Sequence, residues 1–166
     1  MKHQEKKYRV GSFTKALDIL NKNNAKKEKE IISTHYYARK EDNGVVKLVK
    51  YTGRNEIHLL DEVDGKYILK QKIPMKSTEA GLQWLKEKGF KIVDIIKMAY
   101  TDYEYKNGII GLYTINDFLL SIILDYPEGQ HDMFENEFGL KADDVITVPY
   151  NKYLEKISKL KSMELE

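Results

Sequence analysis

A series of tight-turn signals divides much of this chain into short extended segments, and this punctuation restricts the folds open to it. Asn-Gly, Asp-Gly and related pairs favour β-hairpin turns, because these residues adopt a positive φ at little cost. The signals are Asn43-Gly44, Thr52-Gly53, Asp64-Gly65 and Asn107-Gly108. Next to them lie segments rich in β-branched and aromatic residues: Ile31–Arg39, Val45–Tyr51, Glu56–Val63 and Tyr67–Ile73. The pattern predicts an antiparallel meander that ends at Pro74.

The other segments show either helical or extended patterns. Apolar residues recur every three or four positions in the predicted helices, which are 13–20 (after a Ser12 N-cap), 77–88 (before Gly89), 131–138 and 150–160. Further strands are predicted at 3–10, at 90–106 with a bend or interruption, at 109–113 and at 118–126. The charged stretch 21–29 is expected to be a solvated loop, although its lysines could also meet a phosphate.

The expected fold class is α+β. About eight antiparallel strands with few helices favour a closed or nearly closed β-barrel, because closure removes the edges that invite aggregation. A chain of 166 residues suits a single domain covering 1–166. The helical C-terminal segment, about 130–160, should pack on the barrel. Alternate residues of each strand would then point into a tunnel.

Composition sets limits on partners and compartment. The net charge is only +2, from 28 basic and 26 acidic side chains, which gives no reason to expect nucleic acid or a membrane surface as a partner. Cysteine is absent, which excludes disulfides and thiolate chemistry. The start of the chain lacks the apolar core of a signal peptide, so a cytoplasmic location is expected. The oligomeric state is left open.

The first predicted strand carries ionisable residues on one face. In an extended chain His3, Glu5, Lys7 and Arg9 share that face, while Tyr8 lies on the other. A solvated surface strand is the ordinary interpretation, since charged groups are rarely buried unpaired. In a barrel the same face would line a polar tunnel, which needs a ligand, water or ion pairing in compensation.

The four histidines show no close metal-ligand spacing. In the barrel His3 and His58 could both face inward, where with Glu5 they would form a metal or proton-transfer set. Hydrogen-bonded polar packing in the tunnel is the alternative interpretation. The sequence contains no glycine-rich phosphate loop, serine-centred elbow or dinucleotide fingerprint.

Several local strings, in order, resemble the CYTH domain, the triphosphate tunnel fold of class IV adenylate cyclases and thiamine triphosphatases. The family opens with Glu-x-Glu-x-Lys, where this chain has His3, Glu5 and Lys7. The other resembling segments are Thr34–Tyr37, Val46–Val49, Lys97–Ala99, Leu112–Tyr113, Phe118–Ile122 and Pro149–Leu154. The resemblance runs from about residue 3 to 158 and implies a tunnel in which basic residues grip a triphosphate.

The resemblance also implies which side chains carry the chemistry. Cations neutralise phosphate oxygens, and carboxylates hold one or two divalent metal ions. The matching cations are Lys7, Arg9, Lys47 and Lys97, with Lys50, Lys70 and Lys72 as lesser additions. Only Glu5 remains among the acids, since other residues replace the rest: His3, Thr34, Tyr113, Leu120 and Ile122. The last pair would make one tunnel wall apolar.

The leading expectation is a divergent CYTH-like tunnel protein that binds an anionic phosphate-bearing ligand, with weak or absent catalysis. The ligand would be an organic triphosphate, a nucleotide or polyphosphate, bound without a required cofactor. The enzyme alternative is a triphosphatase or class IV adenylate cyclase that needs Mg²⁺ or Mn²⁺ and uses Glu5 with other acids, such as Asp61, Glu62, Asp102 or Glu104. A non-catalytic assembly module is the third possibility.

Overall fold

The computed structural model describes residues 2–41 and 44–165, with side chains described up to residue 158. The chain divides into two compact units: Met1–Ile31 with Met98–Thr147, and Ile32–Lys97 with Val148–Glu166. The strands are β1 His3–Val10, β2 Lys26–Lys27, β3 Ile31–Arg39, β4 Val45–Tyr51, β5 Arg54–Val63, β6 Lys66–Met75, β7 Lys91–Tyr105, β8 Gly108–Ile115, β9 Leu119–Pro127 and β10 Val145–Ile146. The helices are α1 Thr14–Lys22, α2 Thr78–Glu87, α3 His131–Phe138 and α4 Tyr150–Leu165, with a 3₁₀ turn at Ala142–Asp144.

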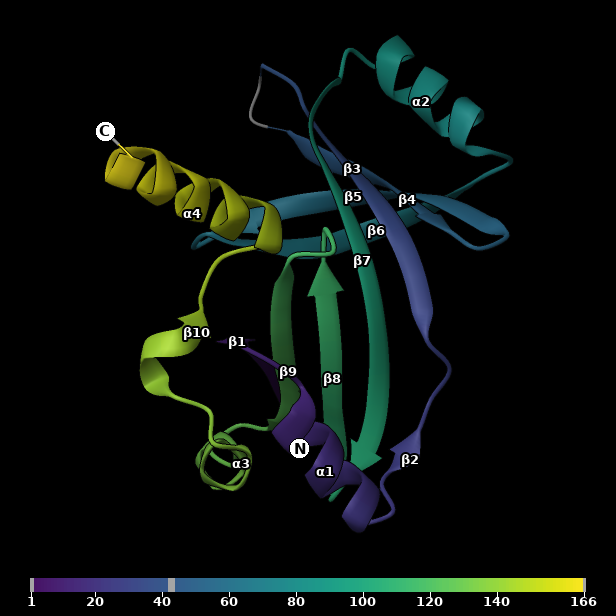
Figure 1. The fold of residues 1–166 in the computed structure, drawn as a ribbon. Helices are drawn as coiled ribbons and strands as arrows, with labels where there is room; N and C mark the ends of the chain where they lie inside the picture. Colours follow the sequence, from purple (N-terminus) through teal and green to yellow (C-terminus); the bar gives the residue numbers. More distant parts are fainter. Residues whose placement is uncertain (1, 42–43, 166) are drawn as a thin grey trace. The chain divides into compact units, whose positions relative to one another are not determined.

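In the first unit the strands follow the order β10-β1-β9-β8-β7, and the short β2 pairs with β7. Figure 1 shows β8 and β9 side by side. One face of this sheet is apolar, and α1 and α3 cover it, because both helices place apolar residues at helical spacing. The core between them includes Tyr8, Leu112 and Ile122 from the sheet, Leu20 from α1 and Phe134 from α3. The opposite face carries Glu5, Lys7 and Arg9 of β1.

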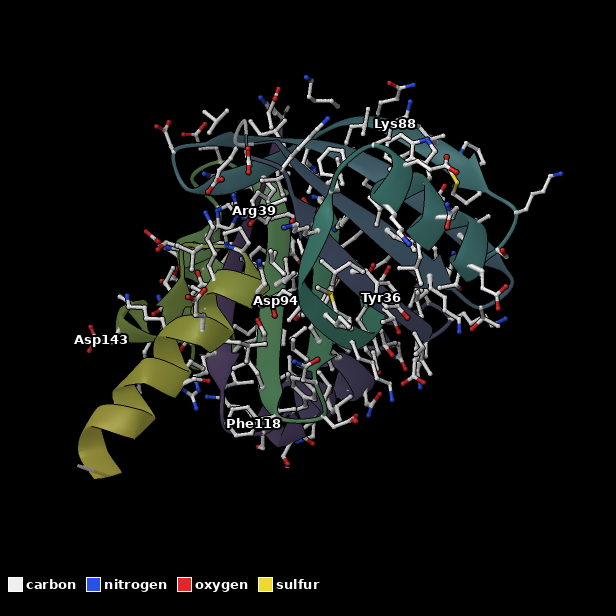
Figure 2. The ribbon with its side chains drawn as sticks, turned by 90° about the horizontal axis from the view of Figure 1, so that it is seen from above. Tyr36, Arg39, Lys88, Asp94, Phe118 and Asp143 are labelled. Carbon is white, nitrogen blue, oxygen red and sulfur yellow. The ribbon has the colours of Figure 1, made fainter. Side chains whose placement is uncertain are left out.

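In the second unit the strands follow the order β7-β3-β4-β5-β6. Helix α2 packs on one face through Leu85, against Leu48 and Ile57. Ser77 caps this helix by accepting a hydrogen bond from the Ala80 N–H at 3.0 Å, and Lys88 lies at the other end (Figure 2). Alternation places Lys47 and His58 on the other face of the sheet, together with Val45 and Val49.

The predicted α+β class with an antiparallel sheet is confirmed, and all the longer strands and helices lie where the sequence placed them to within a few residues. Within 2–41 and 44–165 the hydrogen-bonded path ends at β10 and β6, so the sheet is not closed by hydrogen bonds. The Asp64-Gly65 turn has the expected positive φ at both residues. Asn43 lies outside the described residues.

Some local predictions were wrong. Pro74 lies inside β6, opposite Glu56; β6 ends the strand order, and proline is tolerated on an edge strand because no ladder bond needs its missing N–H. The strand predicted as bent is one continuous 15-residue strand, β7. The N-cap of α1 is Phe13 rather than Ser12, and the loop 21–29 contains the short β2. The single domain remains a prediction.

Candidate functional site

In the second unit four polar side chains form a row across the face that α2 does not cover. Lys47 of β4 is paired with Tyr37 of β3 and with His58 of β5, and His58 is in turn paired with Lys72 of β6. Directly paired residues on antiparallel strands point to the same face, so these side chains are neighbours. We call Tyr37, Lys47, His58 and Lys72 the cationic row.

Lys47 is the centre of this row. Its side chain is half-buried, and its ammonium lies 5.6 Å from the centre of the Tyr37 ring. No carboxylate among the described residues forms an ion pair with it. Burial, followed by the nearby positive charge of Lys72, lowers the pKa of Lys47 to about 8. The amine is thus partly desolvated and has no counter-charge from the protein, which is an unfavourable state for a cation.

Two buried histidines flank Lys47. His58 Nε2 lies 3.3 Å from Glu56 Oε1, and burial lowers the pKa of His58 although Glu56 opposes this shift. His35 Nε2 lies 2.9 Å from Ser33 Oγ, and burial, with Lys47 and His58, lowers the pKa of His35 to about 3. The His35 Nδ1 atom finds no hydrogen-bond partner in the described part of the chain. Both rings are therefore neutral near pH 7.

A second group of polar residues in the same unit connects β3, β5, β6 and α4. Arg39, at the end of β3 (Figure 2), lies 3.5 Å from Glu62 and donates to the Tyr67 hydroxyl at 3.1 Å. Lys152 pairs with the same Glu62, and Asn151 donates to Tyr67 at 3.4 Å. Two cations therefore contact Glu62, one of the acids named in the enzyme alternative. Its neighbour Asp61 likewise pairs with Lys70 at 3.5 Å.

The polar face of the first unit brings acids together. Glu5 of β1 is directly paired with Asp125 of β9. Partial desolvation and the charge of Asp125 raise the pKa of Glu5, while Lys7 lowers it. Desolvation and Asp125 also raise the pKa of Asp102 on β7. Asp125 thus influences two further carboxylates, and we call Glu5, Asp102 and Asp125 the acidic group.

The prediction of an apolar tunnel wall at Leu120 and Ile122 was wrong. Ile122 packs in the core with Leu112, on the face covered by α1 and α3, and alternation places Leu120 on the same face. The polar face of β9 carries Asp125 instead. Sequence reasoning missed Asp125 because the resemblance matched the family's acids on this strand to Leu120 and Ile122. The pairing of Glu5 with Asp125 also depends on strand register.

The acidic group does not form a ready metal site. Among the described residues, no three His, Cys, Asp or Glu side chains lie close enough together to hold a metal ion. The charge of Asp125 raises the pKa of both Glu5 and Asp102, which is the repulsion expected between neighbouring carboxylates. The residues present thus do not fit Mg²⁺ or Mn²⁺ in this geometry.

The other predicted site residues are distributed as follows. Arg9 borders a cavity of about 330 Å³ with Phe118 and Asp144; Phe118 itself is exposed (Figure 2). His3 Nδ1 lies 3.3 Å from Asp125 in the first unit, whereas His58 belongs to the second.

Lys97 is exposed, and alternation along β7 places it on the opposite face from Asp94, which acts electrostatically on Tyr37. The structure therefore does not place Lys97 with the cationic row.

Comparison with known proteins gives relatives by structure alone. No protein-family model and no curated protein matches the chain. A protein from Pyrococcus horikoshii OT3 has a TM-score of 0.73 at 17% identity, over 90% of this chain and 98% of that one. A proposed adenylate cyclase from Vibrio parahaemolyticus has a TM-score of 0.69 at 11% identity, over 93% and 98%.

A third solved structure has a name that describes an activity. It is a proposed adenylyl cyclase from Hippeastrum, described as having a dominant triphosphatase activity, with a TM-score of 0.57 at 11% identity over 83% of this chain and 88% of that one. Identities this low show a shared fold only. The chain therefore has the CYTH-like fold that the sequence resemblance predicted. Among its described helices, none combines the length and the apolar character needed to cross a membrane.

Proposed function

We propose that this protein binds an anionic, phosphate-bearing ligand through the cationic row, with little or no catalysis. The ligand class is an organic triphosphate, a nucleotide or polyphosphate. Lys47 and Lys72 would neutralise phosphate oxygens, and neutral His58 would hydrogen-bond to them. Lys7 and Arg9, on the polar face of the first unit, are further proposed phosphate-binding residues. The fold relatives, two of which have names that refer to cyclase or triphosphatase activity, support this ligand class.

One observation carries the proposal: Lys47 is half-buried beside Lys72 and lacks a carboxylate partner within the described residues. A desolvated ammonium next to a second cation is costly, and proteins usually compensate such a charge with an acid. A bound anion would supply the missing charge. The same arrangement repels metal ions, so binding requires no cofactor.

The test compares two lysines of the same strand. Lys47→Ala removes the central cation of the row, whereas Lys50→Ala removes an exposed cation of β4 that alternation places on the other face. Thermal shift and calorimetric titration with tripolyphosphate, ATP and thiamine triphosphate, all with EDTA, should show binding by the wild type and by Lys50→Ala. Lys47→Ala should bind the same ligand at least tenfold more weakly.

Two outcomes would contradict the proposal. A flat response of the wild type to all three ligands would leave the assembly module as the better interpretation. Equal weakening in Lys47→Ala and Lys50→Ala would mean that general surface charge, and not the row, attracts the anion.

The acidic group favours one second candidate, a metal-dependent triphosphatase or adenylate cyclase. Glu5 and Asp125 face each other directly, and Asp125 also acts on Asp102. Their present geometry does not hold a metal ion, and we derive no catalytic step from one. Hydrolysis or cyclisation of ATP that required Mg²⁺ or Mn²⁺ and disappeared in both Glu5→Gln and Asp125→Asn would establish this candidate.

A further inference from the structure

Among the described residues, no carboxylate on the strands that adjoin Lys47 forms an ion pair with it. From β3 it meets Tyr37, and the neutral His35 lies close enough to interact with it. From β5 it meets His58, and the charge of Lys72 on β6 acts on it. Its neighbours on the same face of β4 are Val45 and Val49, which alternation places beside it.

The nearest acids act on other groups. Glu56 of β5 contacts His58 at 3.3 Å and Arg54 at 3.8 Å. Asp94 of β7 acts on Tyr37, and its own pKa rises through desolvation and the charge of Glu155 on α4. The protein thus offers Lys47 little compensation for its positive charge.

A site of this kind couples ligand binding to proton binding. An anion interacts favourably with the ammonium form of Lys47 and much less with the neutral amine, so it binds best when the proton is present. By linkage, the bound anion also holds that proton more tightly. A lysine in water stays charged up to about pH 9, so below that pH its binding of an anion would not be coupled to proton binding.

We infer that the cationic row binds its phosphate ligand together with a proton on Lys47, so that alkaline conditions weaken binding. This inference rests on the proposed function and adds its regulation. The proton binds to a side chain of the protein and not to the ligand, so this pH dependence is a property of the protein.

The size of the effect follows from the lowered pKa of Lys47. In the free protein a pKa of about 8 leaves most of the amine charged at pH 7 and about a tenth of it charged at pH 9. If the ligand binds only the charged form, the dissociation constant rises about tenfold from pH 7 to pH 9. At pH 8 the binding of each ligand takes up about half a proton.

The experiment uses Lys47→Arg as the partner of the wild type. Arginine keeps the positive charge and does not titrate in this range. Affinity for tripolyphosphate is measured with EDTA at pH 7, 8 and 9, by calorimetry in buffers of different ionisation enthalpy. The ligand's own titration is common to both proteins and cancels in their ratio. Between pH 7 and pH 9 the wild type should lose about tenfold more affinity than Lys47→Arg, and only the wild type should show the extra proton uptake at pH 8.

Parallel pH profiles of wild type and Lys47→Arg would overturn the inference while leaving the proposed function intact. Failure of the wild type to bind at pH 7 would instead refute the proposed function. If Lys47→Arg does not fold or bind, Lys72→Met provides the second test. Lys72 lowers the pKa of Lys47, so Lys72→Met should lose its affinity at a higher pH than the wild type. An unchanged or lower midpoint of affinity against pH would also overturn the inference.

Discussion

Replacing Asp125 by asparagine should stabilise this protein at pH 8. Asp125 faces Glu5 directly across the β1–β9 pair, and its charge raises the pKa of both Glu5 and Asp102. Like charges placed directly opposite on neighbouring strands destabilise a sheet by about 0.2–1 kcal/mol. Since Glu5 is exposed and water screens the repulsion, we expect a gain of about 0.5 kcal/mol, at the lower part of that range.

The pH dependence of this gain has a definite sign. A carboxyl group whose pKa is raised in the folded state binds its proton more tightly there than in the unfolded chain. Its contribution to stability therefore falls as the pH rises from the pKa of the unfolded chain to the raised pKa of the folded protein. The interval begins at the ordinary values of 4.5 for Glu5 and 3.8 for Asp102. Asp125→Asn should therefore be more stable than the wild type at pH 8, and the difference should vanish near pH 3.

The assay is urea unfolding followed by circular dichroism at both pH values, with EDTA present. A gain of about 0.5 kcal/mol moves the midpoint by roughly 0.2–0.5 M urea. Asp125→Asn also alters the 3.3 Å contact between Asp125 and His3 Nδ1, so the comparison is repeated in a His3→Gln background. A variant that is less stable than the wild type at pH 8 in both backgrounds would refute the idea that these carboxylates repel each other.

Two further predictions concern α2. Ser77→Ala removes the side-chain acceptor of the Ala80 N–H and should lower the free energy of unfolding by about 1 kcal/mol; an unchanged urea midpoint would mean that water replaces the cap. Gly81→Ala gains helix propensity of about 1 kcal/mol, but its new Cβ would lie 2.5 Å from Cδ1 of the buried Leu48. Overpacking costs about 1–3 kcal/mol, so net destabilisation is expected, and a higher thermal midpoint would contradict it.

Local patterns in the sequence were enough to predict the elements of the fold. Turn pairs such as Asp64-Gly65 and the helical spacing of apolar residues depend on backbone preferences within a few residues. The alternation of β1 was also sufficient to separate Glu5 and Lys7 from the buried Tyr8, since a strand has a period of two. These features needed no knowledge of distant neighbours.

The candidate site was predicted only in part. Lys47 was named as a candidate phosphate-binding cation, and its neighbours His58 and Lys72 were named only separately or as lesser additions. Their assembly into one row depends on the registers β4–β5 and β5–β6. Lys97 was misplaced because the resemblance gave its position along the chain, without the face of β7 on which it lies.

What the sequence by itself determined is therefore the order of strands and helices and the polar or apolar face of most strands, because these follow from the properties of adjacent residues. Tertiary structure alone decided which residues of different strands face each other. A shift of one residue in register turns every side chain to the other face, and no local preference records it. For that reason Asp125, and not Leu120 or Ile122, meets Glu5, and Lys47 lies beside Lys72 with no acid paired to it among the described residues.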